Sequence, residues 1–164
     1  MKNAAKLLID RLPKLKKSLA VLTKRDVLVG VPGETASRKE PGEGMNNATL
    51  AYIHENGSPA ANIPARPFME PGVEDAKPKI IHHFELAAKR AMTGDDGFVE
   101  RGLHAAGMVT QSAIRKRINE GPPPALAAST IAARKARGRQ STKPLVDTGQ
   151  LRNSINYVIR KKET

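Results

Sequence analysis

The sequence predicts an α+β protein in which a small sheet packs against helices. Residues 26–31 form a short apolar run rich in β-branched side chains, and residues 155–160 alternate in polarity, so both are predicted strands. Residues 2–22, 73–92 and 97–119 instead repeat apolar side chains every three or four positions, as amphipathic helices do. Aromatic residues make up only 3% of the chain, so its core must rely on small aliphatic side chains, which favours helices.

The length of 164 residues suits one domain with a modest core. We expect a single α+β domain over residues 1–164, with a mixed or antiparallel sheet packed against two longer helices, plus an N-terminal amphipathic helix. The chain has no Cys, which excludes disulfides, thiol catalysis and Cys-based zinc sites. No apolar run approaches the ~20 residues that span a bilayer, and no secretory signal is visible, so we expect a cytoplasmic protein without a membrane partner.

The N-terminal helix carries a leucine stripe: Leu8, Leu12, Leu15, Leu19 and Leu22. Pro13 interrupts the pattern, so either the helix kinks there or its second half begins near this residue. We favour packing of the stripe on the chain's own sheet. The second interpretation is docking of Leu12, Leu15 and Leu19 on a neighbouring subunit.

Residues 33–46 contain Gly and Pro but few large apolar groups, which predicts a flexible loop. Asn47 can then cap a helix over residues 48–55, and Gly57 is placed to end it.

The following segment, residues 63–71, is rich in proline. Pro64 and Pro67 flank Arg66, remove two backbone donors and predict an extended edge segment rather than a helix or an interior strand. We expect Arg66 and Phe68 to form a contact between subunits, because Arg and aromatic side chains commonly anchor interfaces. In the alternative, Phe68 fills the core of the monomer and Arg66 pairs with a local carboxylate such as Glu70.

In the second of the two central helices, Gly102, Ala106 and Gly107 are small enough for another helix to approach closely. Gly121, followed by three prolines, should end this helix. Ser129 could cap a short basic helix that ends at Gly138.

Asp147 or Thr148 is placed to cap a brief helical turn before the last strand. Asp147-Thr148-Gly149 is similar to the active-site triplet of aspartic proteases, which need two such Asp residues and would therefore require a dimer here. Only 15 residues follow Gly149, so the structural cap is the favoured interpretation and the dimeric protease a weaker alternative. The four histidines lack zinc-binding spacing, and no nucleophile elbow or phosphate loop is present. We therefore expect no enzyme activity, no cofactor and no metal.

Charge is distributed unevenly along the chain, which carries a net +12. Residues 1–25 carry a net +7, residues 26–110 a net −4, and residues 111–164, which include a basic C-terminal tail, a net +9. Basic ends could pair with the acidic middle of a neighbouring copy or bind nucleic acid. Because no aromatic residues are interleaved with the basic stretches and no DNA-binding motif is visible, we favour subunit contacts.

Three segments together resemble the tail-completion and head–tail joining proteins of tailed bacteriophages, a group of virion-morphogenesis proteins. They are Leu50-Ala51-Tyr52-Ile53-His54-Glu55-Asn56-Gly57, Ile63-Pro64-Ala65-Arg66-Pro67-Phe68 and Leu145-Val146-Asp147-Thr148-Gly149-Gln150-Leu151-Arg152-Asn153-Ser154-Ile155. They cover about a fifth of the chain, and two Ala-rich helices separate the second from the third.

The resemblance implies a non-enzymatic structural subunit of the phage neck or tail, located in the virion and assembled in the host cytoplasm. Such a subunit forms a ring, often a hexamer, that completes the tail or joins it to the head. Its expected partners are copies of itself and other neck or tail proteins, with possible contact to genomic DNA in the channel. The alternative function is that of a basic nucleic-acid-binding protein.

Overall fold

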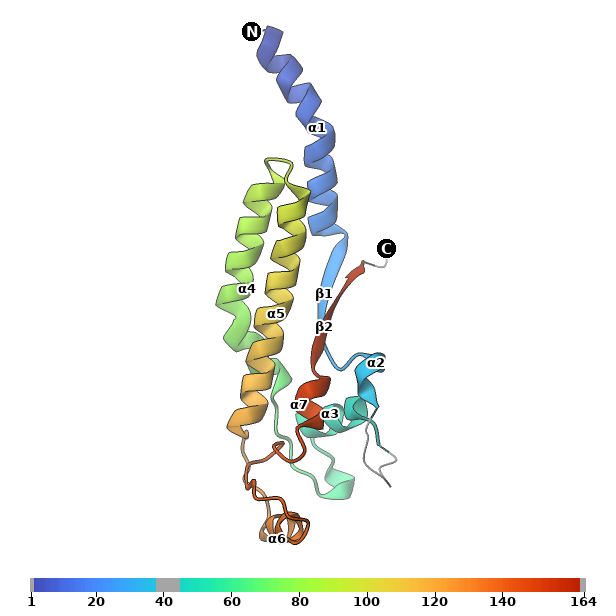
Figure 1. Cartoon of the computed structure of the whole chain (residues 1–164), viewed down its shortest axis with the longest axis vertical. Helices are drawn as coiled ribbons and strands as arrows, with labels where there is room; N and C mark the ends of the chain where they lie inside the picture. The colour runs from blue at the N-terminus through green and yellow to red at the C-terminus, as the bar shows by residue number, and fades with distance from the viewer. Residues whose placement is uncertain (1, 38–44, 163–164) are drawn as a thin grey trace. The chain divides into compact units, whose positions relative to one another are not determined.

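The structure is a computed structural model that describes the backbone of residues 2–37 and 45–162, and side chains from residue 12 onward within these ranges except at position 96. It is mostly helical, with one small antiparallel sheet of two strands, β1 (Arg25–Gly30) and β2 (Asn156–Lys161). The predicted pairing of the two strands is therefore confirmed (Figure 1). β1 is half-buried rather than fully buried, with Leu28 38% exposed.

The chain divides into two units by its internal contacts. Unit 1 comprises Met1–Leu28, Lys77–Val109 and Val158–Thr164, and unit 2 comprises Val29–Ala76 and Thr110–Tyr157. Two long helices, α4 (Met69–Ala91) and α5 (Asp96–Glu120), each contribute to both units. They confirm the two predicted central helices, although α4 begins four residues earlier than the expected Val73.

Unit 1 is built around the helix α1 (Lys2–Thr23), the later part of α4 and the first part of α5. α1 runs through Pro13 as one helix. The prediction that small residues allow close helix contact is confirmed at Gly102, where a Cβ atom would lie 2.8 Å from the Cβ of Ala87. Buried side chains of α4 and α5 are small or aliphatic and include Ala87, Ala91, Val99, Leu103 and Ala106.

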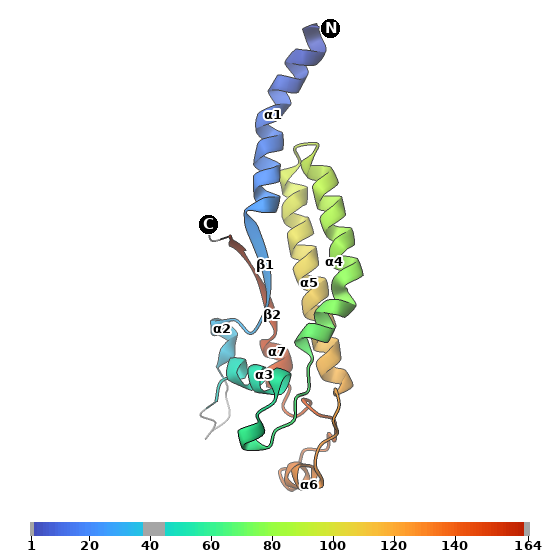
Figure 2. The ribbon, with the colours of Figure 1, turned by 180° about the vertical axis from the view of Figure 1, so that it is seen from behind.

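The described residues of unit 2 form four further helices: α2 (Gly33–Ala36), α3 (Asn47–Asn56), α6 (Ala128–Ala136) and α7 (Gln150–Ser154). A 3₁₀ turn, η1 (Pro59–Ala61), follows α3. Figures 1 and 2 show α3 beside α7, and α2 beside α3. α2 occupies the start of the predicted loop at 33–46, and residues 38–44 of that loop lie outside the described residues.

Helix boundaries in unit 2 refine the predicted caps. Asn46, one residue before the expected Asn47, caps α3 by accepting a hydrogen bond from the Thr49 backbone N–H at 2.8 Å. Gly57 ends α3 with a φ of 78°, and Gly121 follows α5 with a φ of 75°, as predicted. Ser129 does not cap α6, because it lies inside that helix and Ala127 occupies the cap position without a side-chain bond.

The core of unit 2 joins α3, the segment before α4, the end of α5 and the C-terminal segment. Its buried apolar side chains are Ala51, Phe68, Ile114, Ile118, Leu145, Leu151 and Ile155. Here α4 and α5 also approach closely, since a Cβ atom on Gly72 would lie 2.7 Å from the Cα of Ile114. The carbonyl of Ile155 accepts hydrogen bonds from Gln111 and Arg115 of α5, which anchors the junction of α7 and β2.

Candidate functional site

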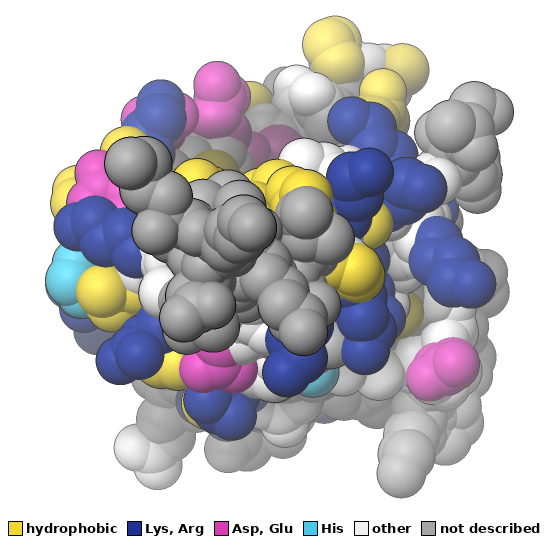
Figure 3. Space-filling view, turned by 90° about the horizontal axis from the view of Figure 1, so that it is seen from above, with side chains coloured by type: hydrophobic (Ala, Val, Ile, Leu, Met, Phe, Trp, Pro, Cys, Tyr) yellow, Lys and Arg dark blue, Asp and Glu magenta, His cyan; other side chains and the backbone are white. Residues whose placement is uncertain are grey.

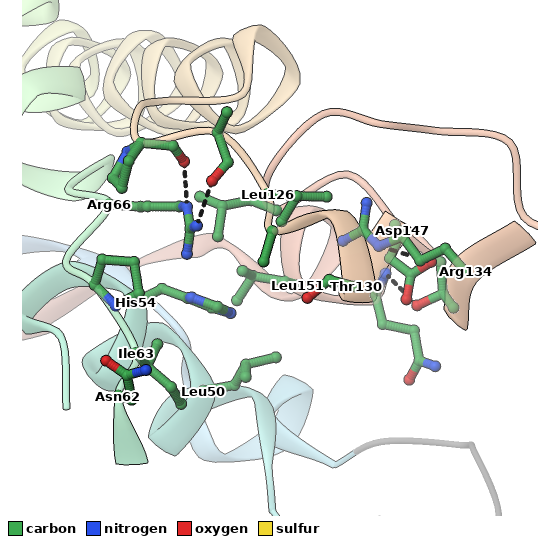
Figure 4. Close-up of a pocket in the computed structure, with 18 residues that line it drawn as sticks. Leu50, His54, Asn62, Ile63, Arg66, Leu126, Thr130, Arg134, Asp147 and Leu151 are labelled. Atoms are coloured by element: carbon green, nitrogen blue, oxygen red, sulfur yellow. Dashed lines mark hydrogen bonds and ion pairs between the residues drawn. The ribbon is translucent and has the colours of Figure 1, made fainter. Parts of the chain in front are cut away.

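Unit 2 contains a pocket of about 630 Å³, which we call the junction pocket. Each of the three segments singled out in the sequence contributes to its walls: Leu50 and His54 come from the first, Ile63 and Arg66 from the second. The third contributes Leu145 and residues 147–151, and the loop and helix between 124 and 134 complete the lining (Figure 4). Segments almost a hundred residues apart in the sequence thus meet around one cavity.

Glu55 of α3 caps the N-terminus of α4. Its carboxylate accepts hydrogen bonds from the backbone N–H groups of Phe68 (2.8 Å), Met69 (2.9 Å) and Glu70 (3.0 Å). The next residue, Pro71, has no N–H group, so the first helical turn has no unsatisfied donor. The negative charge of Glu55 is also favourable at the positive end of the helix dipole.

This cap corrects the prediction that residues 63–71 are extended throughout. Residues 64–68 lack regular structure, but α4 begins at Met69 and includes Pro71 in its first turn. Proline is tolerated in a first helical turn, where its missing N–H has no intrahelical partner.

Arg66 lies inside unit 2 and is only 6% exposed. Its guanidinium donates from Nε to the Pro124 carbonyl at 2.7 Å and from Nη2 to the Ala125 carbonyl at 3.1 Å (Figure 4). The side chain therefore fastens the proline-rich loop after α5 to the segment before α4. The predicted pairing of Arg66 with Glu70 is wrong, because Arg66 binds these two carbonyls instead.

Phe68 is fully buried, at 0% exposure, in the core of unit 2. This is the position expected in the alternative interpretation, in which Phe68 fills the core. The expectation that Arg66 and Phe68 present themselves to another subunit is corrected by their burial, since both side chains are used within the unit.

Asp147 forms ion pairs instead of capping α7. Its carboxylate lies 2.6 Å from Arg139 Nη1. It also lies 3.8 Å from Arg134 Nε, and Figure 4 shows Asp147 and Arg134 together. The N-cap residue of α7 is Gly149, which adopts a left-handed conformation and has no side chain that could make a capping hydrogen bond. Thr148 accepts only a long hydrogen bond from the Gln150 N–H, at 3.5 Å, so the predicted cap is wrong for Asp147 and marginal for Thr148.

Arg134 was missed by sequence reasoning, which predicted only a short basic helix in this region. It is 8% exposed, and its Nη1 lies 2.9–3.1 Å from the carbonyl oxygens of Ser141, Lys143 and Val146. Together with Asp147, it holds the irregular segment 138–149 against α6. No sequence signal separates this arginine from its exposed neighbours Lys135 and Arg137.

The leucine stripe of α1 is only partly covered in unit 1. Leu15, Leu19 and Leu22 are half-buried, while Leu12 is 42% exposed. Tyr52, on α3, is 69% exposed and is one of only five aromatic residues in the chain.

Asp75 of α4 and Arg117 of α5 form a bidentate pair in unit 2, with distances of 2.6 and 2.7 Å. The hydrogen bonds from Arg117 hold the pKa of Asp75 below its ordinary value of 3.8, so this carboxylate stays charged at neutral pH. Within the described residues, no cluster of three or more His, Asp or Glu side chains could hold a metal ion, and no helix is long and apolar enough to cross a membrane.

Comparison of the chain with protein-family models, curated proteins and solved structures finds no match.

Proposed function

We propose that the chain is a non-enzymatic structural subunit of the neck or tail of a tailed bacteriophage. In this proposal it forms a ring, for which we expect six copies, that completes the tail or joins it to the head. The observation that carries the proposal is the junction pocket, because all three segments that resemble tail-completion proteins meet there in one framework. A resemblance limited to separate surface loops would support the proposed function much less strongly.

The charged residues of this framework support a structural role. Glu55 binds three backbone N–H groups, Arg66 binds two carbonyls, and Arg134 binds three. A reactive site would direct such groups toward a ligand, whereas these are directed at the chain's own backbone. They hold short helices and irregular segments in place, as a subunit that makes repeated identical contacts requires.

Tyr52 is the residue we propose for a contact between subunits in the ring. It lies in the first of the three segments, and its 69% exposure leaves an aromatic ring in water. Aromatic side chains are enriched among the residues that dominate protein interfaces. Leu12, an exposed residue of the leucine stripe in unit 1, is a second candidate for this contact. Phe68 and Arg66 are not candidates, because both side chains are buried.

The experiment is to measure the mass of the purified full-length protein by analytical ultracentrifugation and to image it by negative-stain electron microscopy. We expect closed rings of a uniform number of subunits. Replacing Tyr52 by Ala should leave the unfolding free energy within ~0.5 kcal/mol of wild type, because the side chain is exposed. It should weaken each subunit contact by about 2 kcal/mol, roughly 30-fold in the association constant.

Met108→Ala is the matched control, because Met108 is 56% exposed on α5 and the substitution also removes exposed apolar area. It should assemble normally. A wild-type protein that stays monomeric at every concentration up to its solubility limit would overturn the proposed ring. Equal loss of assembly in both variants would remove Tyr52 as the specific contact.

A further inference from the structure

Unit 1 contains a second hollow of about 760 Å³, lined by the end of α1, the start of β1 and the end of β2. Five of the eight described residues that line it are cationic: Lys17, Lys24, Arg25, Lys161 and Lys162. The other three, Ala20, Val21 and Thr23, are small or medium-sized side chains of α1. We call this feature the basic groove.

Backbone pairing brings the two basic ends of the sequence together in the groove. The Lys162 N–H donates to the Lys24 carbonyl at 2.8 Å, directly beyond the paired strands. Lys24 therefore lies next to the pair Lys161–Lys162, although more than 130 residues separate them in the chain. In Figure 3, Lys and Arg side chains lie on several sides of the view, with acidic side chains between some of them.

The cations of the groove are largely exposed to solvent. Lys17, Lys24, Lys161 and Lys162 are all exposed, while Arg25 is half-buried and pairs with Glu100. None of the described residues that line the groove carries a carboxylate. Exposed ammonium groups that share one groove, such as those of Lys24, Lys161 and Lys162, repel one another, and an anionic ligand would relieve that repulsion.

We infer that the basic groove binds the phosphate backbone of duplex DNA without reading its sequence. Several lysines in one groove match a ligand with closely spaced negative charges, since duplex DNA carries one charge per ~1.7 Å of its axis. Among the described residues, the lining includes no aromatic side chain on which an unpaired base could stack, which disfavours a single-strand site. Lysine makes contacts with phosphates that position a duplex but carry no sequence information.

A second copy of this chain fits the groove less well than a nucleic acid does. The chain carries a net +12, so a second copy offers the cationic groove far fewer negative charges than duplex DNA does. Several of its carboxylates are also engaged internally: Asp75 with Arg117, Asp147 with Arg139, and Glu55 with backbone N–H groups. The inference does not rest on the proposed virion function, and it holds for the groove whether or not the chain forms rings.

The test measures binding of full-length protein to fluorescent duplexes of two unrelated sequences, by anisotropy over a range of salt concentrations. If all five cations contact phosphates, the slope of log K against log salt should be about −4.5, so affinity should fall roughly 500-fold between 50 and 200 mM salt. The two sequences should bind equally. Lys161→Gln combined with Lys162→Gln should reduce the magnitude of the slope by about 2.

The matched control is Lys79→Gln with Lys89→Gln, which removes the same charge from exposed lysines of α4 that do not line the groove. It should keep the wild-type slope. Equal losses in the groove and control variants would overturn the inference, because binding would then follow net charge alone. Polyglutamate binding as tightly as DNA of the same charge would also overturn it, in favour of an acidic protein partner. Ring formation, measured in parallel, should be unchanged in the groove variant, which separates this result from the proposed function.

Discussion

Substitution of Glu55 tests the central structural claim about unit 2, that one carboxylate of α3 caps α4. Glu55→Gln keeps the size of the side chain but replaces one acceptor oxygen by an amide donor and removes the charge. At least one of the three hydrogen bonds from Phe68, Met69 and Glu70 must be lost. Glu55→Ala removes all three.

The expected magnitudes follow from the strength of hydrogen bonds to a charged group. Such bonds contribute ~1.5–3 kcal/mol each, so Glu55→Gln should lower the unfolding free energy by about 1–3 kcal/mol. Glu55→Ala should lower it by about 3–5 kcal/mol, because the N–H of the fully buried Phe68 loses its partner while that of the exposed Glu70 can bind water.

Urea unfolding followed by circular dichroism measures these differences, and hydrogen exchange of the Met69 and Glu70 amides reports the cap directly. Exchange of both amides should accelerate in Glu55→Gln even if the protein remains folded. Glu85→Gln, an exposed carboxylate further along α4, is the control and should change stability by less than ~0.5 kcal/mol. If Glu55→Gln matches this control in both stability and amide exchange, the capping argument is wrong.

Three further substitutions test other contacts by the same unfolding assay. Arg66→Met keeps most of the buried stem but loses both bonds to the 124–125 loop, and should destabilise by about 2–4 kcal/mol. Asp147→Asn should destabilise by about 1–2 kcal/mol, because the charge that pairs with Arg139 matters here, whereas a helix cap would accept Asn almost as well. Gly72→Ala should destabilise by about 1–3 kcal/mol despite the higher helix propensity of Ala, because its Cβ would overlap Ile114.

Matched controls separate these effects from generic ones. Arg160→Met alters an exposed arginine of β2, and Gly97→Ala places a methyl group on α5 where the nearest atom is 3.7 Å away. Both should leave stability nearly unchanged. If Arg66→Met lowers the unfolding free energy no more than Arg160→Met does, the proposed role of the Arg66 hydrogen bonds is wrong. If Gly72→Ala leaves the unfolding free energy unchanged, the proposed close contact between α4 and α5 is wrong. An Asp147→Asn variant as stable as wild type would show that the ion pairs of Asp147 do not contribute to stability.

Much of the fold could be predicted because its signals are local. Helical periodicity located α1, α4 and α5, and terminator glycines at positions 57 and 121 marked helix ends correctly. The apolar run and the alternating run gave the two strands. Each of these signals depends on side chains a few residues apart, so no knowledge of tertiary contacts is needed.

The errors occurred where a distant partner decides the local structure. Proline content predicted an extended segment up to residue 71, but Glu55, more than ten residues earlier, supplies the acceptors that let α4 begin at Met69. The role of Asp147 was misassigned for the same reason, since its partners Arg134 and Arg139 lie on and beyond α6. Local propensity cannot identify such partners, because many charged residues compete for the same role.

By itself, the sequence determined the helices, the strands and the uneven charge, with basic ends around an acidic middle. Only the tertiary structure decided which charges meet. Strand pairing placed Lys24 beside Lys161 and Lys162, while burial directed Arg66 and Arg134 toward backbone carbonyls inside unit 2. The physical reason is that a buried charge must find a partner nearby in space, whereas an exposed lysine remains solvated and available to an outside anion.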